Sequence, residues 1–423
     1  MRSVRAGRLW RIFSSLSTTQ LVNAATGLLF WTLAARTFTA GQLGLGAALI
    51  AAATAAAAFG VLGVHTLLLE RIGAVADADR RPLLGLGLAV SALGGAGVAL
   101  GWAGLTKLVT LPGALGELSA AMVALLIVTA GLAAACTTFD NAAVGLGGAN
   151  IQLRRNVIAA ALRIAALIGA GQLTTRGGEV LLAVWAAGLL GSLLLSPIRR
   201  HLPARAPRTP APRRRLFGEH WRAAVVHHGL SLAQGSSLYL LPLVVASLLA
   251  ATEVAYFNQA RLFSDLAFSF PFILTVALFA TSRNPDGFRR NAPRTLLSGL
   301  VLTLGFLAGA ALLGRYLLLA FGEQYSRESL PILLILLCAG PAIVVKDHVV
   351  VLRRLQHRRT EGAVTMLLWN GAELAAAVLG GLRWGMTGLL AAWVLTSTVL
   401  ALAAVPVLVR AIRAGPPAHP SVG

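Results

Sequence analysis

Four polar residues interrupt a long apolar stretch at residues 254–281. Asn258, Arg261, Asp265 and Ser269 follow i, i+3, i+7, i+11 spacing, which places them along one narrow stripe of a helix. Arg261 and Asp265 are also one helical turn apart, the spacing of an ion pair. The arginine fork can bind a phosphate while the carboxylate tunes it or carries a coupling ion. The alternative is a self-neutralising pair buried for packing.

Uncharged polar residues form similar stripes in two other apolar stretches. Gln20 and Asn23 lie in residues 14–35, and Gln234 lies in residues 223–250. Amide side chains on one helix face suit the lining of a sugar-sized polar cavity. Hydrogen bonds between neighbouring helices explain them nearly as well.

Two further charges fall well inside apolar stretches. Glu373 is near the middle of residues 362–381, with Asn370 one turn earlier, and Arg163 precedes Glu373 by 210 positions in a similar Ala/Leu/Gly context. If Arg163 and Glu373 both face a central cavity, they can sense substrate charge or a proton. If they face each other, they form a structural ion pair.

A last group of charges lies near the ends of apolar stretches. Asp140, Lys346 and Asp347 are near ends that we assign below to the cytoplasmic side, and Arg36 follows the first stretch on the other side. Long charged side chains at helix ends commonly reach the membrane interface. These residues are therefore interfacial charges or members of gating salt bridges.

The elements that position these residues are membrane-spanning helices. Hydrophobic residues make up 57% of the 423 residues and charged residues only 12%, far from the balance of a soluble domain. A transmembrane helix needs roughly 20 mostly apolar residues. That length predicts twelve spans, at about 14–35, 43–69, 82–106, 117–140, 157–174, 179–198, 223–250, 254–281, 295–319, 330–351, 362–381 and 386–409. Pro341 inside the tenth span allows a kink.

The basic residues give the orientation. The formal net charge is +21, but most of the arginines lie at the two ends and in every second gap between spans, around residues 71–81, 154–155, 199–222, 283–294 and 353–359. By the positive-inside rule both termini are cytoplasmic. The charge therefore encodes topology, and we expect no nucleic-acid partner. Abundant arginine, alanine and glycine with little lysine indicate a GC-rich bacterial genome.

A basic, proline-containing interval divides the spans six and six. The predicted organisation is a six-helix bundle at 1–198, a cytoplasmic linker at 199–222, a second bundle at 223–409 and a cytoplasmic tail at 410–423. An even number of spans per half makes a parallel repeat, related by a pseudo-twofold axis along the membrane normal.

No enzyme chemistry is evident in the sequence. No P-loop occurs, and the longest outer gap is about a dozen residues, too short for a polysaccharide polymerase or ligase. Cys136 and Cys338 lie inside predicted spans and are expected to be small buried packing residues. We expect no metal site and no cofactor.

Several short segments, in this order along the chain, are similar to one transporter family. They are Leu28-Leu-Phe-Trp-Thr-Leu-Ala-Ala-Arg36-Thr-Phe-Thr-Ala-Gly-Gln-Leu-Gly44, Ala255-Tyr-Phe, Phe321-Gly-Glu-Gln-Tyr325 and Gly385-Met-Thr-Gly388. Over nearly its whole length the chain resembles the polysaccharide transporters, or Wzx-like oligosaccharide flippases, of the MATE-like flippase superfamily. The first span carries Gln20 and Asn23 where the drug and cation antiporters of this superfamily typically use a carboxylate.

This resemblance implies an all-α, V-shaped pair of six-helix bundles that moves a lipid-linked oligosaccharide across the bacterial cytoplasmic membrane by alternating access. The partners would be membrane lipids, the polyprenyl-diphosphate-linked substrate and a coupling ion, either H⁺ or Na⁺. In such families cationic cavity residues meet the diphosphate, a role that falls first on Arg261 and then on Arg163. The alternative is an ion-coupled small-molecule antiporter, in which Asp265 or Glu373 would be central.

Overall fold

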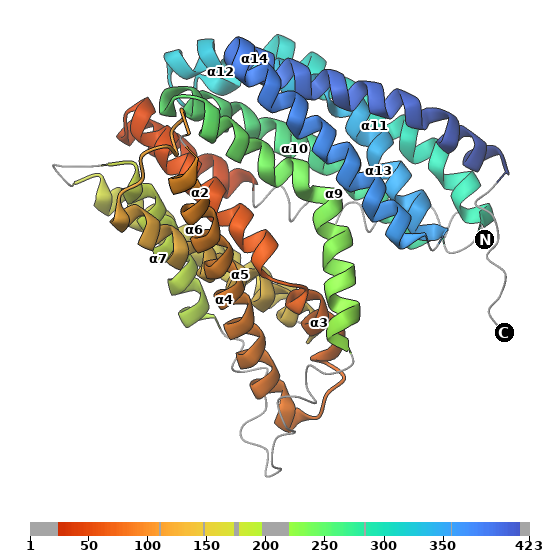
Figure 1. The fold of residues 1–423 in the computed structure, drawn as a ribbon, viewed down its shortest axis with the longest axis horizontal. Coiled ribbons are helices and arrows are strands. Elements are labelled where there is room, and N and C mark those ends of the chain that lie inside the picture. Colours follow the sequence, from red (N-terminus) through yellow and green to blue (C-terminus); the bar gives the residue numbers. More distant parts are fainter. Residues whose placement is uncertain are drawn as a thin grey trace. The chain divides into compact units, whose positions relative to one another are not determined.

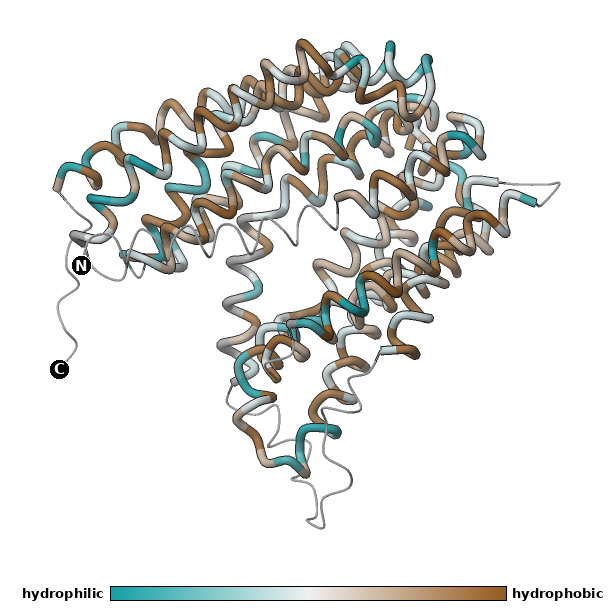
Figure 2. The backbone as a smooth tube through the Cα atoms, turned by 180° about the vertical axis from the view of Figure 1, so that it is seen from behind, coloured by the Kyte–Doolittle hydropathy of each residue, from teal (hydrophilic) through white to brown (hydrophobic). Residues whose placement is uncertain are grey.

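The computed structural model describes residues 24–109, 111–146, 149–172, 177–196, 220–282, 285–356 and 358–414. All the regular structure in these ranges is helical (Figure 1). Within them, seven helical segments are long and apolar enough to cross a membrane. Hydrophobic residues predominate along the helices (Figure 2). The predicted all-α polytopic membrane fold is confirmed.

The chain groups into two compact units. The first comprises residues Leu33–Ala255. After a helix over residues 24–37, it contains α2 (Ala40–Gly60), α3 (Val64–Arg71), α4 (Asp77–Leu108), α5 (Ala120–Gly145), α6 (Ala149–Ala170), α7 (Glu179–Leu195) and α9 (His220–Leu248). Helix α5 is central, because it packs against α2, α3, α4, α6 and α7.

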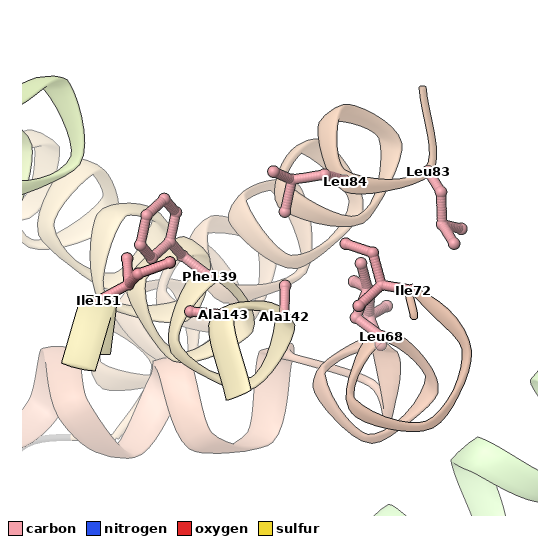
Figure 3. Close-up of a cluster of buried hydrophobic side chains, with 9 residues drawn as sticks. Leu68, Ile72, Leu83, Leu84, Phe139, Ala142, Ala143 and Ile151 are labelled. Atoms are coloured by element: carbon pink, nitrogen blue, oxygen red, sulfur yellow. The ribbon is translucent and has the colours of Figure 1, made fainter. Parts of the chain in front are cut away.

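An apolar cluster joins α3, α4, α5 and α6 at one end of this unit (Figure 3). Leu68 of α3 and Ile72, the C-cap residue of α3, are buried there with Phe139 of α5. Between α4 and α5, the hydroxyls of Ser91 and Thr138 hydrogen bond at 2.6 Å, and both residues are fully buried. A polar contact of this kind joins helices where lipid supplies no hydrophobic drive for association.

The second unit comprises Tyr256–Gly423, with which residues 24–32 also group. Its helices are α10 (Ala251–Thr281), which begins in the first unit, α11 (Pro285–Leu318), α12 (Glu323–Cys338), α13 (Gly340–Leu355) and α14 (Arg359–Ala414). Helix α14 packs against α11, α12 and α13. Phe270 of α10 stacks on Phe306 of α11, with ring centroids 5.6 Å apart.

Two of the predicted spans are broken helices. The stretch at 43–69 divides into α2 and α3 at Leu62 and Gly63, whose φ angles are 48° and 81°. Left-handed backbone costs little at glycine and more at leucine, so packing must hold this break in place. The tenth predicted span divides into α12 and α13, and Pro341 occupies the first turn of α13, where its missing N–H removes no helical hydrogen bond.

The two last predicted spans are the two halves of α14. They are separated by non-helical backbone at Trp384 and Gly385, and Gly385 has a φ of 62°. A glycine adopts this conformation without steric penalty. Gly380 and Gly388 lie beside this reversal, and a side chain on Gly380 would collide with the backbone of Gly388. The halves can therefore approach closely.

The compact units divide the chain differently from the predicted bundles. Helix α9 follows the linker in sequence, yet it groups with the first unit because it packs against α2 and α3. Most of the linker lies outside the described residues. The six-plus-six division and the parallel repeat therefore stay predictions.

The two cysteines differ in their surroundings. Cys136 is buried in α5, as expected, and its thiol lies 3.8 Å from the carbonyl oxygen of Leu189. Cys338 is exposed, so the prediction of a buried packing residue was wrong there. The cysteine ends α12, where Leu336 and Leu337 supply the buried side chains instead.

Glycines in α4 provide a test of the helix packing. A methyl group on Gly95 would lie 2.7 Å from the carbonyl oxygen of Ala130 and 2.9 Å from Cβ of Ala134, whereas one on Gly97 would have no neighbour within 4 Å. We expect Gly95→Ala to lower the unfolding free energy by about 1–3 kcal/mol, the usual cost of overpacking. Gly97→Ala is the matched control and should leave stability unchanged. Thermal unfolding in detergent measures both, and equal stability of the two variants would contradict this packing.

Candidate functional site

A buried ion pair lies between α13 and α14. The Lys346 ammonium donates to both carboxylate oxygens of Glu373, at 3.1 and 3.0 Å, and also to the side-chain oxygen of Asn370. Glu373 and Asn370 are each 1% exposed. Because an ammonium has three N–H donors, these acceptors can satisfy all of them. We call Lys346, Asn370 and Glu373, together with Trp369 and Ser397, the lysine–glutamate cluster.

Two neutral donors complete the shell of the carboxylate. Trp369 donates from Nε1 to Oε1 of Glu373 at 2.8 Å, and Ser397 donates from Oγ to the same oxygen at 2.7 Å. Trp369 and Glu373 are one helical turn apart on the first half of α14, and Ser397 is on the second half. The reversal at Gly385 therefore brings the serine to the carboxylate. A buried charge is tolerated when it is paired and its remaining lone pairs or protons are hydrogen bonded.

The sequence predicted Lys346, Asn370 and Glu373 as candidate residues but not their pairing, and it missed Trp369 and Ser397. Lys346 was expected as an interfacial or gating charge, yet it is only 7% exposed and lies inside the helix packing. Glu373 was expected to face a cavity or to pair with Arg163, and its partner is Lys346 instead. The signal for Trp369 was its i, i+4 spacing to Glu373. For Ser397, 24 positions away, the sequence offered none.

The residues that follow Lys346 are buried as well. Asp347 is 8% exposed, and His348 is 1% exposed. The ring of His348 hydrogen bonds through Nε2 with the hydroxyl of Thr295 on α11, at 3.0 Å, and through Nδ1 with the carbonyl oxygen of Val344, at 2.8 Å. This segment of α13 is therefore a polar core between α11 and α14.

A second ion pair is buried in the other unit. Arg155 of α6 donates from Nε and Nη2 to the two carboxylate oxygens of Asp140 on α5, both at 2.6 Å. The hydroxyl of Ser192 on α7 accepts a third bond at 3.1 Å. Arg155 is only 5% exposed, so counting it among the cytoplasmic loop arginines was wrong. The planar guanidinium turns inward because Asp140 offers it two parallel acceptors.

The polar stripe on α10 is accessible. Arg261 donates from Nε to Asp265 at 3.0 Å, which confirms the predicted i, i+4 pair, and the two side chains are 32% and 45% exposed. In the part of the chain that the structure describes, the terminal nitrogens of Arg261 make no hydrogen bond. Asn258 is half-buried, and its amide nitrogen has no partner among the described residues. Ser269 hydrogen bonds to its own helix at Leu266.

Arg163 rests on an aromatic ring. Its guanidinium carbon lies 3.6 Å from the ring centroid of Trp185 on α7, a cation–π contact. Gly188, one turn further along α7, leaves room for the arginine, because a methyl group there would lie 3.0 Å from Nε. That Nε is buried and has no hydrogen-bond partner among the described atoms. Arg163 is thus held by a ring and not by an acid.

The other predicted positions add less. Gln20 and Asn23 lie outside the described residues, as does the side chain of Gln234 on α9. Arg36 is exposed at the end of the helix over residues 24–37. Among the described residues, no three His, Cys, Asp or Glu side chains are grouped so that they could hold a metal ion.

Solved structures with the same fold belong to one group of transporters. A multidrug resistance MATE family transporter of the MOP superfamily, in its inward-facing conformation, is 15% identical, with a TM-score of 0.68 over 94% of this chain and 98% of that one. An outward-facing MATE family transporter gives 14% identity and a TM-score of 0.60 over 95% of this chain and 96% of that one. A MOP superfamily transporter from Pyrococcus furiosus, described by a binding pocket of reversed polarity, gives the same identity, TM-score and coverage. No protein-family model and no curated protein sequence matches the chain. The fold is therefore that of the MATE transporters.

The lysine–glutamate cluster can be tested by a mutant cycle. Lys346→Met leaves Glu373 as a buried charge without a cation, and Glu373→Gln leaves the ammonium without an anion. We expect each change to lower the unfolding free energy by about 3–5 kcal/mol, and the double variant to recover a large part of that loss.

Thermal or denaturant unfolding of the purified protein gives the coupling energy of the cycle. The control is the exposed pair of Arg358 and Glu361, with side chains 54% and 59% exposed, where Arg358→Ala should change stability by less than about 1 kcal/mol. Additive losses from the two buried changes would show that the pair is not coupled.

Proposed function

We propose that this chain is an alternating-access membrane transporter that moves a polyprenyl-diphosphate-linked oligosaccharide from the cytoplasmic to the outer leaflet. The observation that carries the transport function is the fold, because the chain aligns over nearly its whole length with transporters in both inward-facing and outward-facing conformations. The substrate class rests on this chain's own charges, which are considered next.

The buried ion pairs argue against a simple cation carrier. A carrier of cations needs a carboxylate that can bind and release its ion. Glu373 accepts four hydrogen bonds, from Lys346, Trp369 and Ser397, and Asp140 is held by Arg155 through both oxygens. Releasing either acid would leave a buried arginine or lysine without its counter-charge, which costs several kcal/mol. The carboxylates of Glu373 and Asp140 are therefore already bound by side chains of the protein and are not available to a transported cation.

The polar stripe of the second unit includes an accessible cation, Arg261. The Arg261 side chain is 32% exposed, and among the described residues only its Nε is hydrogen bonded, to Asp265, so the fork is oriented but not occupied. Arginine binds phosphate oxygens through two parallel hydrogen bonds, a geometry that lysine does not provide. Charges inside membrane helices are expensive, and those that remain accessible usually mark a substrate path. A diphosphate head group fits this site.

Arg163 offers a second cation of a different kind. Its contact with Trp185 leaves no acid to be displaced. An aromatic ring beside a guanidinium is also a surface on which a sugar ring can stack. The head group of a lipid-linked oligosaccharide has anionic and saccharide parts, and the Arg163 site by itself offers a cation and an aromatic ring to such a group.

The fold tolerates binding sites of different polarity. The Pyrococcus furiosus transporter of this fold is described by a reversed pocket polarity that suggests a different function for it. A MATE-like scaffold with arginines at accessible positions is thus compatible with an anionic substrate. We place this chain in a bacterial cytoplasmic membrane with both termini cytoplasmic, on the strength of its arginine distribution.

One observation favours the alternative of an ion-coupled small-molecule antiporter. Asp265 is 45% exposed beside Arg261 and is a carboxylate that a cation or proton can reach. In that case Asp265→Asn would abolish drug efflux, and no lipid-linked intermediate would accumulate in a deletion strain.

The deletion strain decides between the two functions. We expect loss of this gene to leave lipid-linked oligosaccharide on the cytoplasmic leaflet, because synthesis continues while translocation stops. Extraction of the lipid fraction and protection from an added glycosidase in right-side-out vesicles measure the amount and the leaflet. Normal surface polysaccharide, with no accumulation, would contradict the proposal.

The role of Arg261 is tested by substitution. We expect Arg261→Ala to abolish complementation of the deletion strain, and Arg261→Lys to restore only part of it, since lysine lacks the planar fork. Arg383→Ala is the control, because Arg383 is an exposed arginine of α14 that we expect outside the membrane. Membrane protein levels are measured by immunoblot for all three. Full complementation by Arg261→Ala would remove this residue from the mechanism.

A further inference from the structure

Two histidines meet at the break between α2 and α3. His65 is in the first turn of α3, and His228 is on α9. Their ring centroids are 5.1 Å apart and the rings are nearly perpendicular, at 80°. His228 is only 6% exposed, and His65 is half-buried. Both belong to the compact unit Leu33–Ala255, so the contact is internal to that unit.

Each ring has one nitrogen that is buried without a partner. His228 lies against the backbone of Ala58 and Phe59, in the last turn of α2. Its Nε2 has no hydrogen-bond partner among the described atoms. His65 shares a 3.3 Å hydrogen bond between Nε2 and the hydroxyl of Thr66, and its Nδ1 is buried without a partner. The contact of His228 with the end of α2 does not account for the two buried nitrogens that have no partner.

The pair lies beside the break between α2 and α3, against which α9 packs. Leu62 and Gly63 of the break have left-handed backbone. A side chain on Gly63 would lie 2.9 Å from the backbone nitrogen of Val225, so α9 packs directly on the break. Any change in the angle between α3 and α9 must therefore change the contact between the two rings.

Few charges surround the pair. Helix α2 contains no Asp, Glu, Lys or Arg, and α3 turns Leu68 and Ile72 toward α4 and α5. The charged residues of α3 are Glu70 and Arg71, at its far end. Helix α4 has Asp77, Asp79, Arg80 and Arg81 in its first turns and Lys107 at its end. On α5 the charged residue is Asp140, which is paired with Arg155. On α9, the side chains of His220, Arg222 and His227 lie outside the described set.

We propose that His65 and His228 form a proton-binding site that couples transport to a proton gradient. A proton taken up by one ring leaves a positive charge in a place where the described neighbours offer no acid. That state favours a conformation in which α3 and α9 separate and water reaches the rings, because a ligand stabilises the conformation that binds it better. Histidine suits this role because its protonation changes near physiological pH.

This inference rests on the proposed function, which it deepens by naming H⁺ as the coupling ion. In the closed conformation, protonation of both rings at once is disfavoured. Two positive rings about 5 Å apart would repel each other by a few kcal/mol at an effective dielectric constant of about 20. The pair should therefore titrate in two separated steps.

The first experiment measures proton binding directly and requires no transport. Histidine-labelled protein in nanodiscs is titrated by NMR as wild type, His65→Asn and His228→Asn, where the asparagine amide at position 228 can still donate to the end of α2. In the wild type we expect two coupled steps separated by about two to three pH units. In each variant the low-pH step should vanish, and the remaining histidine should titrate in one step above it. If each ring titrates identically with and without its partner, the proposal is overturned.

The second experiment measures coupling. Proteoliposomes that translocate the lipid-linked oligosaccharide are given an imposed pH gradient, and we expect several-fold stimulation in the wild type and in Thr66→Ala, which retains both rings. For the double variant His65→Asn/His228→Asn we expect equal translocation rates with and without the gradient, each compared in the same preparation. Stimulation that persists in the double variant would overturn the proposal. If the wild type translocates no such lipid while its histidines titrate as a pair, the proposed substrate fails and the proton site stands.

Discussion

The cost of an unpaired charge in a membrane governs where this chain can place its polar residues. A charged side chain at the centre of a spanning helix costs about 2.5–3.5 kcal/mol on insertion scales, and pairing removes much of that penalty. The Lys346–Glu373 pair meets the condition with Asn370, Trp369 and Ser397, all contributed by α13 and the two halves of α14. The hydrogen bond from Ser397 to Glu373 requires that the chain reverse near Gly385, so the local backbone helps to satisfy the buried charge.

The same constraint separates structural charges from available ones. In the described helices, Arg155 donates from Nε and Nη2 to Asp140 and from Nη1 to Ser192, and it is nearly inaccessible. Arg261 is bound at one nitrogen and open at the others, and Arg163 is bound only by a ring. A charge that is fully satisfied stabilises the fold, whereas one that is partly satisfied can still take a ligand. This difference carries the argument for an anionic substrate.

The sequence predicted the helices well because hydrophobicity alone sets the length of a membrane span. It also predicted the Arg261–Asp265 pair, since one helical turn separates the two residues. It could not predict the partner of Glu373, because Lys346 lies 27 positions away and meets it only after α12, α13 and α14 have packed. Arg155 was assigned to the cytoplasmic surface because arginine usually reaches outward from a helix end, and only the fold shows the two acceptors of Asp140 beside it. The break at Leu62 was hidden in an unbroken apolar run.

The most direct test of a transporter for an anionic lipid-linked saccharide is translocation by the purified protein. Proteoliposomes would contain a fluorescent polyprenyl-diphosphate oligosaccharide in one leaflet, and its arrival in the other leaflet would be followed by dithionite quenching, beside a parallel assay with a cationic dye. We expect translocation of the lipid-linked saccharide, lost in the Arg261→Ala protein, and no movement of the dye. Transport of the cationic dye together with an immobile lipid-linked saccharide would contradict the account.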